Sequence, residues 1–234
     1  KNVPHGNVQQ ILFWSPSTNK FQRAFVYTPP TYGVNPKEKF PVLYLQHGWG
    51  EDETAWSNQG HENLIMDNLI AEGKCKPFII VNAYGLTNDF KFGSIGQFTG
   101  KEFEEMLCNE LIPYVDSHFK TKTDRNNRAL AGLSMGGMTT KLISGRRVDL
   151  FASFGLLSGG QFAPSDFQDK TQIKYLFVGC GEKENPQGIR KSEADCKGAG
   201  YNIQGYVSEG TAHEFLTWRR CLYVMAQSLF KDTK

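Results

Sequence analysis

Hydrophobic residues along this chain occur in two kinds of pattern, short continuous runs and longer stretches with helical spacing. The short runs are rich in aromatic and β-branched residues and occupy positions 8–14, 21–28, 41–45, 78–81, 128–131, 151–157, 173–178 and 205–208. Apolar runs of this length and composition are typical of strands, and a run without polar interruptions indicates a strand buried on both faces. We therefore expect a sheet of about eight strands.

Longer stretches predict helices between these strands, mostly from apolar residues three or four positions apart, while the stretch at 189–200 is predicted as a polar helix. They cover residues 56–72, 103–119, 138–147, 189–200 and 215–230. Gly73 is a suitable C-terminal stop for the first of them. Pro113 predicts a kink inside the second, because proline removes a backbone donor. Residues 82–100 combine glycines, polar residues and phenylalanines, which predicts a long surface loop.

The order of these elements defines the fold class. Residues 15–20 separate the first two strands and are rich in turn-forming residues, which predicts an antiparallel hairpin at one edge of the sheet. Strands and helices then alternate, so the class is α/β, with a mostly parallel twisted sheet and helices on both faces. The 234 residues contain no internal repeat, low-complexity tract or linker. We expect one domain over residues 1–234.

Composition and charge exclude several classes of function. Hydrophobic residues make up 39% of the chain and aromatic residues 13%, enough for a sizeable core. The formal net charge is +2 without a block of like charge, so neither a nucleic-acid nor a membrane-surface footprint is expected. The longest apolar runs are too short to span a bilayer. Residues 1–5 show no apolar leader, which fits either a cytosolic chain or a mature chain whose leader has been removed.

Cysteine chemistry is not predicted. The five cysteines are Cys75, Cys108, Cys180, Cys196 and Cys221. They show no C-x-x-C spacing and no metal-site rhythm with histidine, so we expect no metal. One or two disulfides would suit a secreted chain, with the pairing open. Cys180 follows an apolar run and is expected to be a small buried hydrophobic residue.

A strand-to-helix turn at residues 132–137, Gly-Leu-Ser-Met-Gly-Gly, is the centre of the predicted chemistry. The Gly-x-Ser-x-Gly pattern between a strand and a helix is that of a nucleophile elbow. Side chains at Gly132 and Gly136 would collide with neighbouring backbone, and Ser134 would be held in a strained conformation with its hydroxyl exposed. The alternative is a glycine-rich turn with an incidental serine. The partners found downstream favour Ser134 as a nucleophile.

A serine hydroxyl needs a base within hydrogen-bond reach. Of the five histidines, His5 lies in the N-terminal tail, His61 and His118 fall on predicted helices, and His47 belongs to a His-Gly turn. His213 lies between the last strand and the last helix, where a base belongs in the chain order serine, acid, histidine. The alternative role for His213 is that of a helix-capping residue.

The acid that orients this base should lie between Ser134 and His213, on the loop after the strand at residues 173–178. Glu184 is the first choice and Glu182 the reserve, while Asp195 falls inside the following predicted helix. A solvated surface carboxylate is the alternative for either glutamate.

An oxyanion hole completes the requirement, and each of its donors is typically worth ~3 kcal/mol of activation barrier. One donor is expected to be the backbone N–H of Met135, directly after the nucleophile. The other is expected from the turn His47-Gly48-Trp49-Gly50, at the N–H of Trp49.

With these motifs in place, the chain resembles the esterase D-like α/β-hydrolases of carbohydrate esterase family 1, and within them the feruloyl esterases of microbes that degrade plant cell walls. The resemblance runs along nearly the whole chain and is carried by residues 44–48, 67–74, 110–115, 123–125, 131–137 and 213–215. It implies an α/β-hydrolase fold with Ser134 as nucleophile and His213 as base. The family usually has aspartate at the position of Glu184, and glutamate requires the loop to be set back by one methylene.

The resemblance implies hydrolysis of ferulate or similar hydroxycinnamate esters on arabinoxylan, without a cofactor. It also implies a secreted enzyme that acts on feruloylated or acetylated xylan oligosaccharides, and we expect a monomer. Trp49, Trp56, Phe92 and Phe98 are candidates for a slot that accepts the flat aromatic acyl group. Acetyl-xylan esterase is the nearest alternative, followed by S-formylglutathione hydrolase and acyl transfer of the mycolyltransferase type. A catalytically silent carbohydrate-binding module is the alternative from another class.

Overall fold

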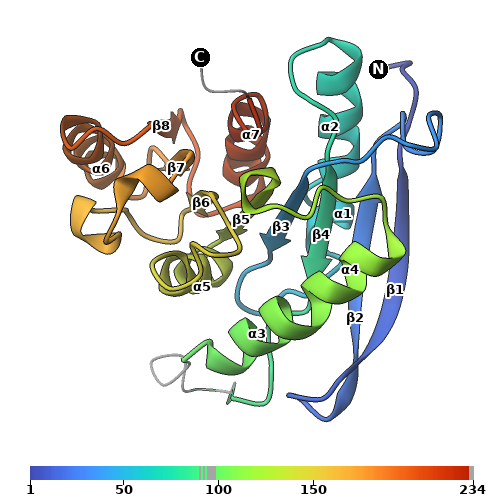
Figure 1. Cartoon of the computed structure of the whole chain (residues 1–234). Helices are drawn as coiled ribbons and strands as arrows, with labels where there is room; N and C mark the ends of the chain where they lie inside the picture. The colour runs from blue at the N-terminus through green and yellow to red at the C-terminus, as the bar shows by residue number, and fades with distance from the viewer. Residues whose placement is uncertain (90, 92, 94–98, 232–234) are drawn as a thin grey trace.

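The computed structural model describes residues 1–89, 91, 93 and 99–231. Its centre is one eight-stranded sheet with the strand order β1-β2-β4-β3-β5-β6-β7-β8 (Figure 1). The strands are β1 (Asn7–Ser15), β2 (Lys20–Thr28), β3 (Val42–Gln46), β4 (Ile79–Ala83), β5 (Arg128–Leu133), β6 (Ser153–Leu157), β7 (Tyr175–Gly181) and β8 (Ile203–Ser208). β1 and β2 pair antiparallel, β2 also runs antiparallel to β4, and β3 to β8 are parallel. The predicted α/β class and N-terminal hairpin are confirmed.

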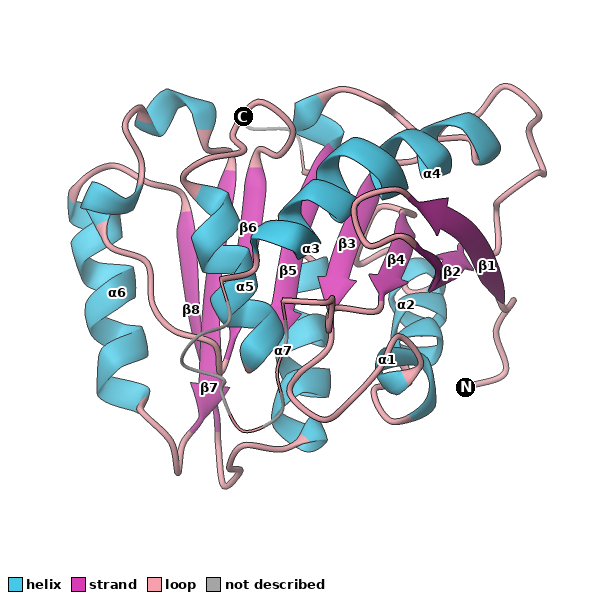
Figure 2. Cartoon of the chain, turned by 90° about the horizontal axis from the view of Figure 1, so that it is seen from below, coloured by secondary structure: helices cyan, strands magenta, loops and turns pink. Residues whose placement is uncertain are grey.

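Helices cover both faces of this sheet (Figure 2). They are α1 (Ala55–Asn58), α2 (Glu62–Ala71), α3 (Lys101–Glu105), α4 (Ile112–His118), α5 (Met135–Ser144), α6 (Pro186–Gly198) and α7 (Phe215–Ala226). Short 3₁₀ turns lie at Arg125–Asn127, Pro164–Asp166 and Lys170–Gln172. Most strands and helices lie within about three residues of their predicted bounds.

Two cores result from the pleat of the buried strands, because successive side chains point to opposite faces. In β3, Tyr44 packs into the core under α3 to α6, whereas Leu43 and Leu45 pack into the core under α1, α2 and α7. Every residue of β3, β4 and β5 is buried. Such strands, covered on both faces, are the physical reason for the continuous apolar runs in the sequence.

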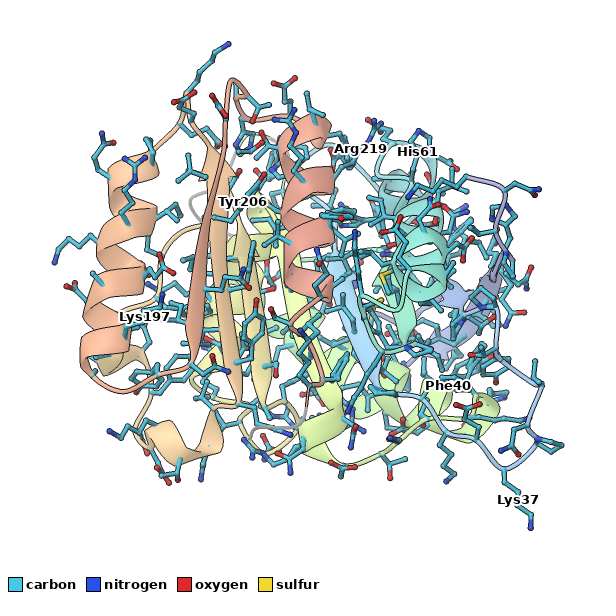
Figure 3. All side chains as sticks on the ribbon, turned by 90° about the horizontal axis from the view of Figure 1, so that it is seen from above. Lys37, Phe40, His61, Lys197, Tyr206 and Arg219 are labelled. Carbon is cyan, nitrogen blue, oxygen red and sulfur yellow. The ribbon has the colours of Figure 1, made fainter. Side chains whose placement is uncertain are left out.

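The single helix expected over residues 56–72 is wrong, because the chain forms two helices separated by a turn. Gly60 lies against α1 so closely that a Cβ there would be 2.4 Å from the carbonyl oxygen of Trp56. His61 follows with a φ of 51° and directly precedes the first residue of α2. The prediction that His61 lies on a helix is therefore wrong. Arg219 of α7 reaches this turn and donates to the carbonyl oxygen of Gln59, which explains why Arg219 and His61 are neighbours in Figure 3.

The helix expected over residues 103–119 is interrupted in a different way. A π-helical stretch, Met106–Leu111, joins α3 to α4, and Pro113 lies at the start of α4. Because Pro113 has no N–H, the regular ladder of hydrogen bonds is broken at this point, and a wider turn accommodates the break. His118 lies in the last turn of α4, as expected.

Three further expectations concern metals, thiols and membranes. Within the described residues, no cluster of three or more potential metal ligands occurs and no helix is long and apolar enough to cross a membrane. All five cysteines are unpaired, and Cys180 is buried as predicted. Burial raises the pKa of the Cys180 thiol, which disfavours the reactive thiolate.

Candidate active site

The turn after β5 holds Ser134 in a strained backbone conformation, with φ of 50° and ψ of −117°. The two flanking glycines have the predicted role. A Cβ on Gly132 would lie 2.4 Å from the carbonyl carbon of Gly136, and one on Gly136 would lie 2.5 Å from the carbonyl oxygen of His47. Only glycine fits at either position, so the sequence enforces a sharp turn. The predicted helix begins directly at Met135, three residues earlier than expected.

The loop between β8 and α7 brings the imidazole of His213 to this serine. Nε2 of His213 lies 2.8 Å from Oγ of Ser134. Threonine hydroxyls fix the shape of the loop, because Thr211 donates to the carbonyl oxygen of Ser208 and Thr217 contacts the Thr211 hydroxyl. His213 also packs edge-on against the ring of Trp218, at 5.1 Å between ring centroids. It does not act as the helix cap considered above, since its two ring nitrogens have other partners.

Glu184 provides the second of those partners. Its Oε1 lies 2.7 Å from Nδ1 of His213, while its Oε2 accepts from the backbone N–H of Gly181 at 2.6 Å and from the Ser158 hydroxyl at 2.8 Å. A carboxylate that accepts these bonds favours the tautomer with the proton on Nδ1 of His213. Nε2 can then accept the proton of the Ser134 hydroxyl.

The other carboxylates considered for this role lie elsewhere. Glu182 turns away from His213 and accepts from the backbone N–H of Gly210 at 2.9 Å. Asp195 lies in α6 and pairs with Lys191. Gly181 lets the loop that carries Glu184 touch the loop that carries His213. A Cβ on Gly181 would be 2.5 Å from the carbonyl oxygen of Thr211, two residues before the histidine.

Sequence reasoning missed two residues that hold the Glu184 carboxylate in place. Ser158, directly after β6, has a φ of 51° and donates its hydroxyl to Glu184. Trp218 of α7 donates its indole N–H to the same Ser158 oxygen at 3.0 Å. The sequence Ser158-Gly159-Gly160 after a buried strand was the available signal for a second special turn.

The loop predicted to supply an oxyanion donor lies against the serine. A Cβ on Gly48 would be 3.3 Å from Cβ of Ser134. His47 anchors this loop, because its Nε2 accepts from the N–H of Gly85 at 2.9 Å and its Nδ1 donates to the carbonyl oxygen of Gly48 at 2.8 Å. Burial lowers the pKa of His47, so its ring is neutral and structural.

Glu51 is a further carboxyl at this loop that sequence reasoning did not identify. Its Oε2 accepts from the N–H of Gly48 at 2.8 Å, so that N–H is directed to Glu51. Burial raises the pKa of Glu51, and the hydrogen bond from the N–H of Gly48 acts in the opposite direction. Met135 N–H lies in the first turn of α5, where helix donors have no acceptor within the helix. The oxyanion roles of Met135 and Trp49 remain predictions.

The four aromatic residues expected to line the acyl slot have different outcomes. Trp49 is partly exposed on the loop beside Ser134. The expectation for Trp56 is wrong, because its side chain has no exposed surface, donates to the carbonyl oxygen of Gln46 and packs against Phe215. Phe92 and Phe98 lie outside the described residues.

Sequence reasoning missed an apolar groove. It lies on the β6 side of Ser134, whereas the loop that carries Trp49 lies on the β3 side. This α5 groove has a volume of about 450 Å³ and is lined by Met138, Lys141, Leu142, Gly145, Gly159 and Asp166. Met138 and Leu142 are exposed by 52% and 45%, although both are apolar. The groove begins one helical turn after Ser134, which is not itself among its lining residues. The N–H of Met138 donates to the Ser134 carbonyl oxygen, and a Cβ on Gly159 would be 2.7 Å from the same oxygen.

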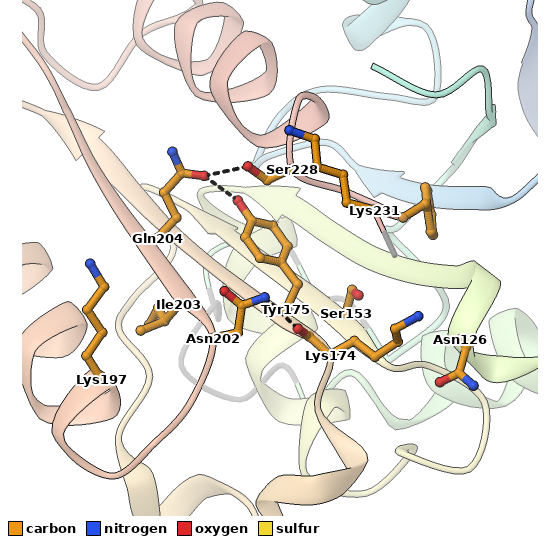
Figure 4. Close-up of a pocket in the computed structure, with 11 residues that line it drawn as sticks. Asn126, Ser153, Lys174, Tyr175, Lys197, Asn202, Ile203, Gln204, Ser228 and Lys231 are labelled. Atoms are coloured by element: carbon orange, nitrogen blue, oxygen red, sulfur yellow. Dashed lines mark hydrogen bonds between the residues drawn. The ribbon is translucent and has the colours of Figure 1, made fainter. Parts of the chain in front are cut away.

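A second cavity of similar size lies at the opposite edge of the sheet, where β6, β7 and β8 begin. This amino-edge pocket has a volume of about 440 Å³, and Lys174, Tyr175, Gln204 and Ser228 contribute to its lining (Figure 4). The hydroxyls of Tyr175 and Ser228 both contact Oε1 of Gln204. No histidine lines it among the described residues.

The strand order and the Ser134–His213–Glu184 arrangement define an α/β-hydrolase. The model of the Esterase family matches residues 15–225, and the chain belongs to that family. An endo-1,4-beta-xylanase/feruloyl esterase of Xylanibacter ruminicola is 64% identical over 234 residues. An endo-1,4-beta-xylanase Y of Acetivibrio thermocellus is 32% identical over 179 residues, or 72% of this chain. The first match covers 99% of this chain but only 32% of that relative, and the second match covers 15% of its relative.

Solved structures agree on the fold. A CE1 ferulic acid esterase of Anaeromyces mucronatus superposes with a TM-score of 0.81 at 20% identity, covering 98% of this chain and 92% of that one. A feruloyl esterase module from Clostridium thermocellum, complexed with sinapinate, gives a TM-score of 0.78 at 22% identity, covering 99% and 90%. At these identities the likeness concerns the fold.

Proposed function

We propose that this chain is a serine esterase that releases ferulate or a related hydroxycinnamate from feruloylated arabinoxylan. The hydrogen-bonded series Ser134, His213 and Glu184 carries this proposal. The names of the relatives support the substrate class, since the Xylanibacter ruminicola protein is called a xylanase and feruloyl esterase.

In the proposed mechanism, Oγ of Ser134 attacks the ester carbonyl carbon while Nε2 of His213 takes the hydroxyl proton. Glu184 stabilises the imidazolium through Nδ1. The N–H groups of Met135 and Trp49 donate to the carbonyl oxygen as it becomes negative. The bond to the sugar oxygen then breaks, and His213 returns the proton to that oxygen.

Water resolves the acyl-enzyme in the second half of the reaction. His213 takes a proton from the water as the oxygen attacks the acyl carbon, and Ser134 leaves with a proton returned by His213. The products are the free hydroxycinnamic acid and the unchanged enzyme. The scheme needs no metal or organic cofactor.

The α5 groove favours an aromatic acyl group over an acetyl group. An acetyl ester needs only a small site at the carbonyl, whereas exposed Met138 and Leu142 offer apolar surface that a hydroxycinnamoyl ring would cover. Methionine sulfur also makes favourable contacts with aromatic rings. Trp49 remains a candidate on the opposite side of the carbonyl.

The wider setting of the reaction is also a proposal. We infer a member of carbohydrate esterase family 1 that is secreted, acts as a monomer on feruloylated or acetylated xylan oligosaccharides and binds neither nucleic acid nor membranes. The xylanase names of both curated relatives support an extracellular polysaccharide substrate.

Hydrolysis of methyl ferulate beside an acetylated xylo-oligosaccharide tests the proposal. We expect the wild type to prefer methyl ferulate and Met138→Ala to weaken that preference without loss of acetyl hydrolysis. Lys37→Ala on a distant exposed loop is the control. A strong preference for the acetyl ester would identify an acetyl-xylan esterase instead.

A further inference from the structure

The β1–β2 hairpin presents apolar side chains to solvent. They lie on the part of the sheet face that α1 and α2 do not cover. Leu12, Trp14 and Phe21, together called the hairpin face, are exposed by 53%, 50% and 64%. Trp14 and Phe21 are directly opposite each other in the strand register, and their rings contact edge-to-face at 5.2 Å between centroids. Isolated exposed apolar residues need no explanation, but these three are neighbours on one face and form an apolar patch that a ligand could cover.

A groove of about 290 Å³ joins this face to the loop that follows β4. Leu12 and Phe21 line it from the hairpin, and Tyr84, Leu86 and Asn88 line it from the loop. Polar groups alternate with the apolar ones. The amine of Lys20 donates to the Asn88 side chain, and Gln22 and Arg23 also contribute to the lining.

The groove is connected to the nucleophile through two contacts. The ring of Tyr84 stacks on His47 at 5.8 Å between centroids, and the N–H of Gly85 donates to the same imidazole. His47 precedes Gly48, which adjoins Ser134. In the strand order, this groove lies on the β3–β4–β2 side of the nucleophile, whereas Gly159 and the α5 groove follow β6 on the other side.

We propose that the hairpin face and its groove bind the neutral sugar chain from which the acyl group is removed. This inference rests on the proposed function. The acyl and alcohol parts of an ester extend from the carbonyl carbon in different directions. If the acyl group occupies the α5 groove, the sugar must extend toward Tyr84. Aromatic rings pack against the C–H face of a sugar, while the amide, amine and guanidinium groups bind its hydroxyls.

Mixed chemistry distinguishes a carbohydrate from a second copy of the chain as occupant. Self-association favours a flat and largely apolar patch with few charges at its centre. Here Lys20 and Arg23 line the groove together with Phe21. Arg23 also pairs with Glu53 while its side chain stays 55% exposed. The surface is concave rather than flat.

The decisive experiment compares methyl ferulate with a feruloylated arabinoxylo-oligosaccharide for Trp14→Ala, Phe21→Ala and the double variant. We expect KM for the oligosaccharide to rise about tenfold in the double variant, a size expected for lost aromatic contacts. Hydrolysis of methyl ferulate should not change. Tyr223→Ala removes an exposed ring from α7 and should alter neither substrate, and Trp14→Phe should restore most of the affinity.

A binding measurement separates this inference from the proposed function. Ser134→Ala should bind unesterified arabinoxylan in affinity electrophoresis, and the added double substitution should abolish the retardation. Wild type inactive on methyl ferulate but retarded by arabinoxylan would refute the esterase proposal alone. Three results would overturn the sugar site. They are an equal loss of activity on both substrates, an unchanged KM for the oligosaccharide, and a wild-type dimer that Trp14→Ala dissociates without altering KM.

Discussion

The two edges of the central sheet carry cavities of nearly equal volume but different chemistry. At the amino edge, the hydroxyl groups of Tyr175 and Ser228 meet the neutral amide of Gln204. At the carboxyl edge, the hydroxyl of Ser134 meets an imidazole that is itself oriented by a carboxylate. Among the described residues, neither a histidine nor a carboxylate lines the amino-edge pocket to activate its serine. Alignment of donors and acceptors, rather than cavity size, distinguishes the reactive edge.

The largest expected difference between the edges is in ester hydrolysis. Ser134→Ala should lower kcat on methyl ferulate by about a million-fold, as removal of a triad serine does elsewhere. Ser228→Ala at the amino edge is the matched control and should leave kcat unchanged. Ferulate release by both variants at comparable rates would show that the nucleophile lies elsewhere.

A smaller difference is expected between two glutamates of one loop. Glu184→Gln should lower kcat by about 10⁴, because an amide cannot accept from Gly181 and Ser158 and also stabilise the imidazolium. Glu182→Gln should have little effect, since the amide oxygen can still accept from Gly210. Steady-state kinetics on methyl ferulate measures both. If Glu182→Gln is the slower enzyme, the acid has been assigned to the wrong glutamate.

A third contrast sets the Glu184 carboxylate against the fully buried carboxyl of Glu62 in α2. Burial raises the pKa of Glu62 from 4.5 to about 7, although Asn82 and Ser57 donate to its oxygens. Between pH 4.5 and 7 the folded chain therefore binds one proton more than the unfolded chain. The stability that this proton contributes is fully present below pH 4.5 and is lost as the pH rises to 7. We expect a loss of about 3 kcal/mol in the free energy of unfolding.

Urea denaturation across this window measures the effect. Glu62→Gln removes the titrating group and should flatten the dependence on pH. Slopes that are identical in the wild type and the variant would mean that Glu62 is ionised in the folded chain throughout.

The smallest contrast concerns two glycines. Gly132→Ala places a methyl group against the backbone of Gly136, and overpacking of this kind should lower the free energy of unfolding by about 1–3 kcal/mol. Gly198→Ala at the end of α6 meets no atom within 4 Å. It should raise that free energy by up to about 1 kcal/mol, because alanine favours helix. Chemical denaturation of both variants checks the opposite signs.

Local patterns in the sequence predicted the fold and the order of the candidate site residues. The elbow at residues 132–137 is recognisable from its local sequence, although the distant carbonyl oxygen of His47 also requires glycine at position 136. The late position of His213 and the acidic loop before it follow from the order of elements in an α/β-hydrolase. Boundaries moved where a special backbone conformation intervenes, as at His61 with its positive φ.

Contacts between distant parts of the chain could not be predicted in this way. Trp56 reads as an exposed aromatic residue near the site, yet Phe215 of α7 covers it. The support of Glu184 by Ser158 and Trp218 joins three separate elements. Periodicity shows that one side of a helix is buried, but not which distant side chain covers a given residue.

The division of Ser134, His213 and Glu184 among three loops has a consequence for folding. These loops follow β5, β7 and β8, and Ser134 meets a histidine 79 positions later in the chain. Contacts of such long sequence separation form late, because closing a long loop costs entropy before any contact compensates for it. Recovery of esterase activity during refolding should therefore lag behind the return of helical circular dichroism, which makes turnover a reporter of the last step in assembly of the sheet.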